Sequence, residues 1–320
     1  MIRRTLKKIV IGTLMMLAAV TPLISRQRYA KQEKPQRIIM FSKNDSFIQT
    51  PYRLGRIEKN YLRRMDELAK RLAQEGYEWR EIIEAYCNKN FRFERGIARR
   101  YRKRFKPRKA LSYARYRKIY GLEDKIRKAY EFYEKYKEEL DVVERTHGFD
   151  KRHIVATLGI ESDYGRFLGK YYAFNALTAL FASDTKKEFG YKQMKYYIEF
   201  CKLRDEDLFK YKSSYAGAIG PAQFLPENLL LYFGREKDPL NMIDCFHAVA
   251  EYHLDCGWDL RYNHLIPREG TRNWKVIKRY NNSKNYVRAR NEIAASLPVE
   301  AVLGSPDAQT VSSKDQDERD

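Results

Sequence analysis

The sequence predicts a mainly α-helical protein. Apolar residues recur every three or four positions through most of the chain between residues 54 and 298, which is the spacing of one face of an α-helix. Apolar residues make up 43% of the 320 residues, enough to build a buried core. A chain of this length is expected to form one large domain or two small ones.

The first 25 residues are typical of an export signal. Four basic residues precede an apolar run over residues 9–24, which is slightly longer than a signal-peptide core and shorter than a comfortable bilayer span. No small-x-small cleavage site follows, so a cleaved signal peptide and an N-terminal inner-membrane anchor both stay open. In either case the remainder is exported to the periplasm or cell envelope. The first cysteine is Cys87, so the chain is not expected to be a lipoprotein.

The helical pattern begins after a polar, basic linker at residues 26–53. We expect one helix from about residue 54, a break at Gly76, and a second helix up to Cys87. Further helices are expected over residues 126–140, 174–181, 194–201, 241–258 and 274–280, with another starting near Asn285. The polar tail 299–320 is expected to be disordered.

Residues 91–120 form a strongly basic segment with thirteen Lys and Arg against one Glu, and tyrosines lie between them. The whole chain has a formal net charge of +21, which suits a polyanionic partner such as nucleic acid, an anionic membrane surface or an acidic wall polymer. Because export is expected, the cell wall is the favoured polyanion and nucleic acid is not expected. A solvated basic helix face is the simpler alternative.

The stretch from His153 to Gly165 contains the principal candidate for catalysis. As a helix it places Ile154, Leu158 and Glu161 on one stripe, so a carboxyl group continues an apolar face. Burial disfavours the charged carboxylate, and a glutamate that stays protonated near neutral pH can act as a general acid. Alternatively, the side chain reaches solvent at the helix end, where Gly165 stops the helix.

Two further stretches are chemically distinctive. The loop over residues 213–226 combines small residues, glycines and prolines with Gln223, and it favours either close approach to a ligand or tight packing. The junction after Tyr280 places amides and a second tyrosine, Tyr286, between two helices. Helix capping is the alternative role for Asn281 and Ser283.

Cysteines and histidines predict no metal site. Cys245 and Cys256 are eleven residues apart on one expected helix, about 16 Å, which exceeds the Cα separation of a disulfide. Those two should not pair with each other, whereas pairing with Cys87 or Cys201 stays open. No Cys-x-x-Cys or His-Glu-x-x-His pattern is present, so we expect no metal and no cofactor.

Together the three stretches resemble lytic murein transglycosylases of the membrane-bound B type, glycoside hydrolase family 103. Gly159-Ile-Glu161-Ser-Asp-Tyr-Gly165 is similar to that family's Gly-Val-Glu-Thr-x-x-Gly segment, and residues 214–226 are similar to its Ser-x-Ala-Gly-Ala-x-Gly-x-x-Gln-Phe-Met-Pro segment. Tyr280-Asn-Asn-Ser-x-x-Tyr286 is similar to its Tyr-Asn-x-Ser-x-x-Tyr segment. Arg102-Lys-Arg-Phe105 and His147-Gly148 have plausible counterparts upstream.

The resemblance implies a lysozyme-like helical catalytic module at residues 54–298, with a small β element allowed. A basic helical N-terminal part, residues 54–150, would pack on a catalytic part, residues 151–298. Glu161 would be the catalytic residue. The substrate contacts would be Ser214, Gln223, Asn281, Tyr286, Tyr164 and Tyr215, although packing is a comparable role for Tyr164 and Tyr215. Ser162 in place of Thr, and Pro221-Ala222 in place of an aromatic-Gly pair, depart from the family pattern.

The implied reaction is cleavage of the MurNAc-GlcNAc β-1,4 bond of peptidoglycan glycan strands, with formation of 1,6-anhydroMurNAc. A single glutamate would act as acid and then as base. Asp163 is the one other acid close by, and at i+2 on a helix it points away from Glu161. A muramidase-type hydrolase of the same fold and a non-catalytic wall-binding or scaffold protein are the alternatives. No oligomeric state follows from the sequence.

Overall fold

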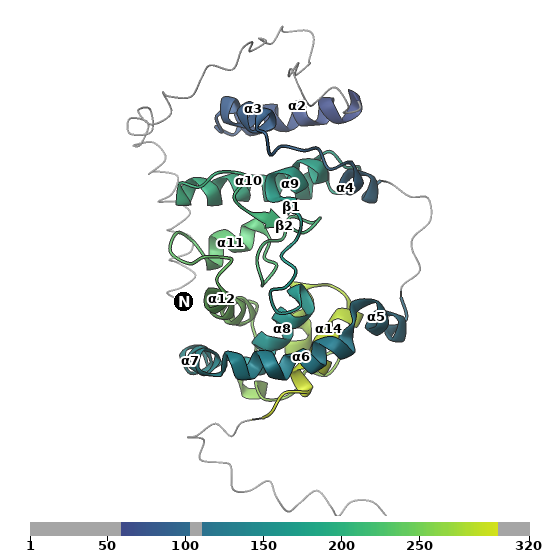
Figure 1. The fold of residues 1–320 in the computed structure, drawn as a ribbon, viewed down its shortest axis with the longest axis vertical. Helices are drawn as coiled ribbons and strands as arrows, with labels where there is room; N and C mark the ends of the chain where they lie inside the picture. The colour runs from purple at the N-terminus through teal and green to yellow at the C-terminus, as the bar shows by residue number, and fades with distance from the viewer. Residues whose placement is uncertain (1–58, 103–110, 300–320) are drawn as a thin grey trace, which may run out of the picture. The chain divides into compact units, whose positions relative to one another are not determined.

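The computed structural model describes residues 59–102 and 111–299, and in these ranges the chain is mainly α-helical, as predicted (Figure 1). The expected export segment at residues 1–25, the linker at 26–53 and the tail from residue 300 lie outside the described residues. The same is true of residues 103–110 in the basic segment. None of the described helices has both the length and the apolar character needed to cross a bilayer.

Three N-terminal helices pack on a central pair. These helices are α2 (Lys59–Gln74), α3 (Trp79–Cys87) and α4 (Arg95–Arg100). Gly76 separates α2 from α3 with φ +88°, a left-handed conformation that suits glycine and ends the helix where the sequence predicts. Both α2 and α4 contact α9 (Ala173–Phe181), every residue of which is buried. The apolar residues of α2 therefore face the rest of the fold.

The central pair consists of α9 and α10 (Lys187–Arg204), with α11 (Pro226–Tyr232) packed on α10. Gly190 brings α10 close to α9, because a Cβ at that position would lie 2.4 Å from the backbone nitrogen of Phe181. Pro226 opens α11 at its first turn, where the missing N–H costs nothing. The sequence analysis did not anticipate α11, which is only 7 residues long.

A two-stranded antiparallel sheet supplies the small β element that the sequence allowed. Strand β1 (Tyr171–Tyr172) pairs with β2 (Lys212–Ser213), and Tyr171 lies opposite Ser213. A Cβ at Gly169 would lie 2.1 Å from the carbonyl carbon of Ser213, so only glycine permits this approach. The sheet thus joins the segment after Glu161 to the loop that carries Ser214.

The remaining helices surround α8 (Lys151–Ser162), as Figure 1 shows in its lower half. They are α5 (Tyr113–Tyr120), α6 (Leu122–Lys135), α7 (Lys137–His147), α12 (Met242–Asp255), the 3₁₀ helix η3 (Leu260–Tyr262), α13 (Arg272–Tyr280) and α14 (Lys284–Ala295).

The prediction of one helix over residues 126–140 is wrong, because α6 and α7 meet at Tyr136. That residue leaves the helical conformation at φ −116° and ψ 25°. Its ring packs against Phe132 of α6, at 4.9 Å between ring centroids, and against Phe246 of α12, at 5.5 Å. Tertiary packing of this aromatic residue accompanies a bend that no glycine or proline marks in the sequence.

Helix α8 is buried on all sides. The sequence predicts one apolar stripe through Ile154, Leu158 and Glu161, but every residue from Lys151 to Ile160 is buried, and so is Ser162. Helices α6, α7, α12 and α14 all contact it. Glu161 is the one half-buried residue of this helix, so its carboxyl group is the part of α8 that can reach solvent.

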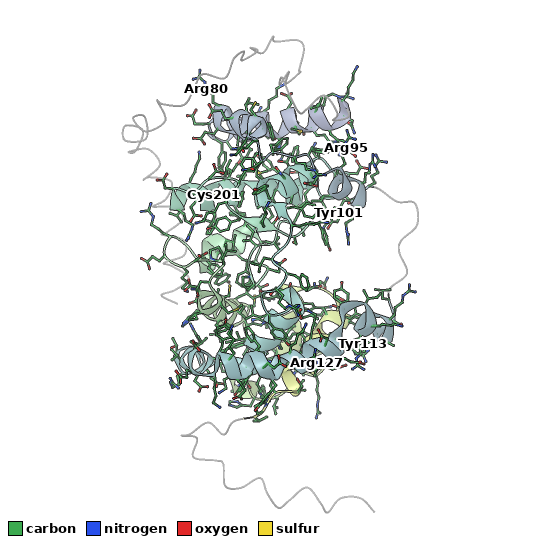
Figure 2. The ribbon with its side chains drawn as sticks, viewed as in Figure 1. Arg80, Arg95, Tyr101, Tyr113, Arg127 and Cys201 are labelled. Carbon is green, nitrogen blue, oxygen red and sulfur yellow. The ribbon has the colours of Figure 1, made fainter. Side chains whose placement is uncertain are left out.

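All four cysteines are free thiols, which confirms that Cys245 and Cys256 do not pair with each other. Cys201 and Cys245 are buried, and Cys201 lies within the helix packing in Figure 2. Basic side chains such as Arg80 on α3 and Arg127 on α6 lie on the surface (Figure 2). In the described parts of the basic segment, Arg99, Arg100, Arg115 and Lys118 are also exposed, as a solvated basic face requires.

Candidate active site

Glu161 occupies the last turn of α8. Its Oε1 accepts a hydrogen bond of 2.7 Å from the hydroxyl of Tyr286, a buried side chain on α14. Burial raises the pKa of Glu161 to about 7, while the Tyr286 hydrogen bond and the positive charge of Lys125 act in the opposite direction. A carboxyl group with this pKa is present in both protonation states near neutral pH, as acid–base catalysis requires.

The turn after Glu161 ends the helix and directs the next acid away. Asp163, Tyr164 and Gly165 have φ values of 52°, 61° and 83°, so three successive residues are left-handed. The carboxylate of Asp163 lies 3.5 Å from Nζ of Lys125 and 3.1 Å from Nζ of Lys128. The charge of Asp163 is held in ion pairs with α6, and Asp163 is the left-handed C-cap of α8 rather than a residue at i+2 on the helix, as the sequence analysis expected.

Tyr164 has the packing role that the sequence left as an alternative. Its side chain is only 9% exposed, and its hydroxyl donates a 2.6 Å hydrogen bond to the carbonyl oxygen of Lys125. The ring lies over Gly159, where a Cβ would come within 2.6 Å of the tyrosine oxygen. A buried ring offers no free face to a sugar.

The loop over residues 213–226 is a tight, internally bonded turn. The hydroxyl oxygen of Ser214 accepts from the backbone N–H groups of Ala216 and Ala218, at 3.4 and 3.2 Å. Gln223 has φ 49°, and its Nε2 donates a 2.8 Å hydrogen bond to the carbonyl oxygen of Gly220. In the described residues nothing donates to its amide oxygen, so a half-buried Gln223 keeps an acceptor for a ligand.

Tyr280 joins this loop to the Glu161 region. Its hydroxyl donates to the carbonyl oxygen of Ala222, and its ring packs 5.4 Å from that of Phe224. Burial raises the pKa of Tyr280 well above its usual value, and the negative charge of Glu161 adds to the effect, which places the two groups in one environment. The sequence analysis quoted Tyr280 in a motif but did not name it as a site residue.

Helix α5 contributes two more tyrosines that the sequence analysis missed. Tyr116 stacks on Tyr120 at 4.1 Å between ring centroids, and Tyr120 is 46% exposed. Burial raises the pKa of both hydroxyls, and the charge of Glu161 contributes to both shifts, so this pair lies near the carboxyl group. The basic segment thus places two tyrosines near Glu161.

Comparison with known proteins assigns the chain to a family. A family model described as a transglycosylase SLT domain matches residues 61–267, more than half of the chain. This chain belongs to the SLT transglycosylase family. The family prediction made from the three sequence segments is therefore confirmed.

The SLT-family chain also has a curated relative. It is 27% identical over 156 residues to membrane-bound lytic murein transglycosylase B of Escherichia coli. The match covers 46% of this chain and 42% of the relative, so the chain aligns with less than half of that protein's length.

Solved structures share the fold. Soluble lytic transglycosylase SltB1 of Pseudomonas aeruginosa aligns with a TM-score of 0.61 and 20% identity, over 72% of this chain and 97% of that one. SltB3 of Pseudomonas aeruginosa, solved with NAG-anhNAM-pentapeptide, aligns with a TM-score of 0.62 and 17% identity, over 75% and 80% of the two chains. The predicted lysozyme-like helical fold is confirmed at this level.

The remaining predicted contacts of the SLT-family site lie on two segments. Asn281 is exposed at the end of α13, and Ser283 caps α14 by accepting from the backbone N–H of Tyr286. Capping is thus the role of Ser283, while the amide of Asn281 stays accessible. Tyr215 is 39% exposed, and the guanidinium of Arg100 lies 4.0 Å from its ring centroid. The substrate roles of Asn281 and Tyr215 stay predictions.

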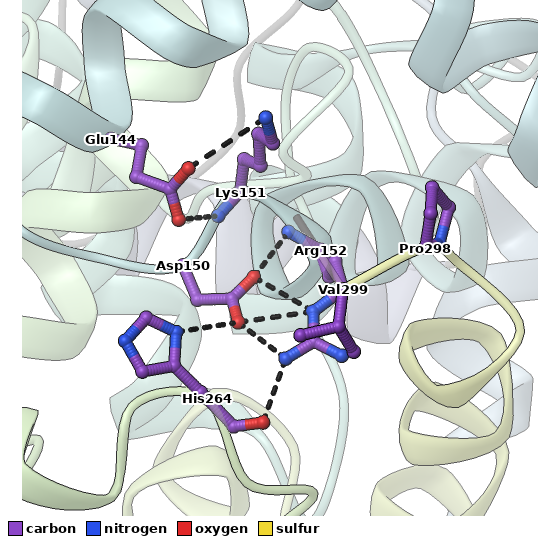
Figure 3. A pocket seen from close by; sticks show the side chains of 7 residues that line it. All are labelled: Glu144, Asp150, Lys151, Arg152, His264, Pro298 and Val299. Carbon is purple, nitrogen blue, oxygen red and sulfur yellow. Dashed lines mark hydrogen bonds and ion pairs between the residues drawn. The ribbon is translucent and has the colours of Figure 1, made fainter. Parts of the chain in front are cut away.

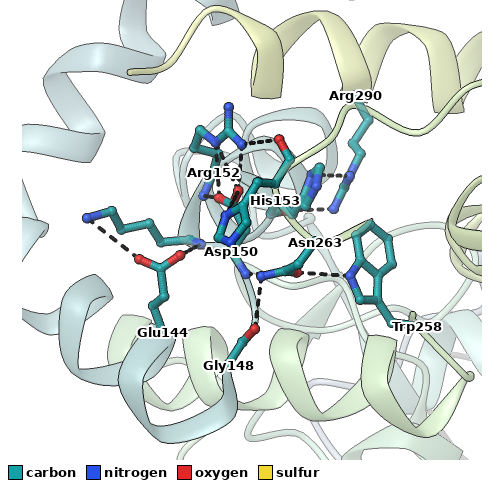
Figure 4. A network of polar contacts seen from close by, with 10 residues as sticks. Glu144, Gly148, Asp150, Arg152, His153, Trp258, Asn263 and Arg290 are labelled. Carbon is teal, nitrogen blue, oxygen red and sulfur yellow. Dashed lines mark hydrogen bonds and ion pairs between the residues drawn. The ribbon is translucent and has the colours of Figure 1, made fainter. Parts of the chain in front are cut away.

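The other end of α8 carries a polar cluster with a different chemistry. Asp150 caps the helix, and its carboxylate takes hydrogen bonds from Nε and Nη2 of Arg152, the latter at 2.6 Å (Figure 4). Arg152 also donates to the carbonyl oxygen of His264, and Glu144 accepts from the backbone of Lys151 (Figure 3). The charges in this small pocket are paired, which is typical of a structural cluster.

Metal ligation has no candidate in the described ranges. Within residues 59–102 and 111–299, no group of three or more His, Cys, Asp or Glu side chains is arranged to hold an ion.

Proposed function

We propose that this protein is a lytic transglycosylase that cleaves the MurNAc-GlcNAc β-1,4 bond of peptidoglycan and forms 1,6-anhydroMurNAc. One observation carries the proposal. Glu161 is a half-buried carboxyl group with a pKa of about 7, and it is hydrogen-bonded to a neutral tyrosine rather than to a cation. Membership of the SLT transglycosylase family supports this activity, and the curated relative is named as a lytic murein transglycosylase.

In the first step, protonated Glu161 donates its proton to the glycosidic oxygen as the bond breaks. The anomeric carbon of the muramoyl residue gains oxocarbenium character. In the second step, ionised Glu161 accepts the proton of the C6 hydroxyl of the same sugar, which attacks C1. The atoms balance without water, and Glu161 ends protonated. Each proton transfer is typically worth about 10²–10⁴ in rate.

Tyr286 acts on the ionised state of the carboxyl group. Its hydroxyl donates to Oε1 of Glu161, so it stabilises the carboxylate that forms between the two steps. Without this donor, burial would keep the carboxyl group protonated too strongly for it to lose its proton to the leaving group.

We assign the substrate contacts to side chains that keep polar atoms or ring faces accessible. Gln223 and Ser214 lie on the tight loop, Asn281 lies at the end of α13, and Tyr215 offers a partly exposed ring. The guanidinium of Arg100 stacks on one face of Tyr215 and adds a positive charge, which suits the carboxylates of the wall peptides. We leave Tyr164 out, because its ring is buried.

A hydrolase of the same fold is the second candidate function. Hydrolysis with inversion or retention normally uses two carboxyl groups at a set separation. Asp163, the acid nearest in sequence, is held by Lys125 and Lys128, which argues against this role. A non-catalytic wall-binding protein would not require a glutamate with a raised pKa.

The proposed place of action is the cell envelope. Residues 1–25 would direct export to the periplasm, either as a cleaved signal peptide or as an inner-membrane anchor, and the partner would be peptidoglycan. The name of the curated relative, which describes a membrane-bound enzyme, agrees with an envelope location. N-terminal sequencing of the protein from membrane and soluble fractions would distinguish cleavage from anchoring.

The test is mass spectrometry of products from purified peptidoglycan, with Glu161→Gln in parallel. Glu144→Gln is the matched control, because Glu144 is another half-buried glutamate whose pKa burial raises, but it lies at the opposite end of α8. We expect anhydromuramoyl ends from the wild type and the control, and none from Glu161→Gln. Reducing muramic ends would make the enzyme a hydrolase, and full activity of Glu161→Gln would remove the assignment.

A further inference from the structure

Arg290 on α14 is a fully buried arginine that hydrogen-bonds only to uncharged groups among the described residues. Its exposed fraction is 0%, and no carboxylate in the described part of the chain forms an ion pair with it. Its Nη1 lies 2.8 Å from Nδ1 of His153, its Nη2 donates to the carbonyl oxygen of His153 at 2.9 Å, and its Nε donates to Oγ1 of Thr157 at 3.3 Å. The proposed mechanism does not use this residue.

These contacts fix the state of His153. A guanidinium carries only donors, so Nδ1 of His153 must be the acceptor, and the imidazole is neutral with its proton on Nε2. Burial, and then the Arg290 charge, lower the pKa of His153 well below its usual value, which agrees with this state. Burial lowers the pKa of Arg290 to about 10, so the guanidinium stays charged at neutral pH.

A buried charge that meets only neutral partners is costly to the fold. The ring of Trp258, 5.9 Å from the guanidinium carbon, and three hydrogen bonds offset part of the cost. An apolar side chain would fill such a position without this cost, so a purely structural role explains the arginine poorly.

The position of Arg290 relates it to the catalytic pair. His153, Thr157 and Glu161 follow one another at intervals of four along α8, and Tyr286 and Arg290 are four apart on α14. Such side chains lie on one face of each helix. Arg290 contacts His153 and Thr157, and Tyr286 contacts Glu161, so α8 and α14 run antiparallel. The contacts of Arg290 and of Tyr286 therefore lie next to each other along the same interface between the two helices.

We propose that Arg290 is a positioning residue that fixes α14 against α8, so that the Tyr286 hydroxyl stays on Glu161 while the carboxyl group loses and regains its proton. The proposal rests on the proposed function of Glu161. The Arg290 charge has a second effect, because it favours donation by the Tyr286 hydroxyl. Burial raises the pKa of Tyr286 well above its usual value, and Arg290 opposes this rise.

The titratable groups that interact with Glu161 come from four packed elements. Tyr286 on α14 and Lys125 on α6 lower the pKa of Glu161, while the charge of Glu161 raises the pKa of Tyr280 on α13 and of Tyr116 and Tyr120 on α5. Arg290 itself faces His153 from α8, and Asp150 acts on it only at longer range.

The test measures the pKa of Glu161 directly, by ¹³C NMR titration of glutamate-labelled full-length protein, with Glu161→Gln assigning the resonance. The variants are Arg290→Met, which removes the charge and all three contacts, and Arg290→Lys, which keeps the charge. Arg152→Lys is the matched control, because Arg152 is also buried but is paired with Asp150 at the N-terminal end of α8, the end opposite to Glu161. Turnover of peptidoglycan and its pH dependence are measured on the same samples.

We expect Arg290→Met to raise the pKa of Glu161 and to lower kcat about tenfold, with KM within about twofold. The reason is that a displaced Tyr286 hydroxyl no longer donates to ionised Glu161. Arg290→Lys should keep the pKa of Glu161 close to the wild-type value and still lower kcat. Arg152→Lys should change thermal stability but neither kcat nor the titration. If Arg290→Lys restores the pKa of Glu161 but not kcat, the effect of the charge is distinguished from the effect of the packing.

An unchanged Glu161 titration and an unchanged kcat in folded Arg290→Met would overturn the proposal. If Arg290→Met does not fold, Arg290→Lys decides. A lower kcat at constant KM, with Arg152→Lys unchanged, supports positioning, and a wild-type kcat overturns it. Failure of the proposed function is recognised separately, because the wild type would then release no anhydromuramoyl product while the NMR titration still reports on Arg290.

Discussion

The two ends of α8 hold carboxyl groups in opposite ways. At the N-terminal end, Asp150 and Arg152 are both buried and form a charge-assisted pair at 2.6 Å (Figure 4). At the C-terminal end, the hydroxyl of Tyr286 is the one hydrogen-bonding partner of Glu161 among the described residues, and burial raises the pKa of Glu161 to about 7. One helix therefore stabilises an ion at its start and disfavours an ion at its end.

The helix dipole acts in the same direction as these partners. A helix N-terminus favours negative charge and a C-terminus disfavours it, by about 0.3–1 kcal/mol at exposed positions. Asp150 accepts from the backbone N–H of Arg152 at the favourable end, and Glu161 occupies the unfavourable end. The difference shows that position along a buried helix, together with the partner's charge, decides whether a carboxyl group is structural or can exchange protons.

The largest effect on stability is expected at the paired end. Asp150→Ala should lower the free energy of unfolding by about 3–5 kcal/mol, because it leaves the Arg152 charge buried without a partner. Asp124→Ala, which breaks surface pairs with Arg127 and Lys128, is the control and should cost about 1 kcal/mol or less. Urea unfolding of both variants tests this, and equal losses would contradict the distinction between the two ends.

Glu161→Gln should instead stabilise the protein, and increasingly so at alkaline pH. The folded pKa of about 7 lies above the usual 4.5, so the stability that protonated Glu161 contributes is fully present below pH 4.5 and is lost as pH rises through 7. At pH 8 the free energy of unfolding of the variant should therefore be about 1–3 kcal/mol higher than that of the wild type, with little difference at pH 4.5. A pH-independent difference would argue against a raised pKa.

Tyr286→Phe should have a smaller effect, confined to the catalytic end. The hydrogen bond lowers the pKa of Glu161, so its loss should raise that pKa and move the alkaline limb of the activity profile to higher pH by about one unit. We expect kcat to fall about tenfold, because the carboxylate loses its donor. Tyr197→Phe, which removes a remote buried hydroxyl bonded to Leu208, should leave the profile unchanged.

Tyr164→Phe is expected to have the smallest effect. It removes the hydrogen bond to the Lys125 carbonyl and should cost about 1 kcal/mol of stability, with KM for glycan strands unchanged. Tyr215→Ala should do the reverse, raising KM with little loss of stability, because its ring is partly exposed. A raised KM in Tyr164→Phe would restore the sugar-contact role that the buried ring argues against.

The sequence predicted those features that depend on local pattern. Periodicity located α2, and the apolar stripe that continues into Glu161 predicted a carboxyl group that burial keeps partly protonated. The bend at Tyr136 was not predictable, because no glycine or proline marks it. The burial of every α8 residue except Glu161 was also missed. A helix that its neighbours enclose needs no polar face, so its sequence lacks the contrast between apolar and polar positions from which burial is predicted.

The rest of the site depends on contacts between distant segments. The chain has 25 tyrosines, and nothing in their local sequence distinguishes Tyr116 and Tyr120 from those that only pack. Arg290 meets His153 across 137 positions, and neither residue belongs to a recognisable motif. Such pairs become visible only when two helices are placed side by side.

The neutral surroundings of Glu161 also bear on how such a protein can evolve. Replacing this carboxyl group by an amide breaks no ion pair, because its hydrogen-bonding partner is an uncharged hydroxyl. A descendant with glutamine at this position would thus keep its fold and the side chains proposed to contact the glycan, and would be more stable above neutral pH. If the proposed function holds, one substitution would convert an enzyme that cleaves peptidoglycan into a protein that only binds it, and selection for stability alone would favour that change.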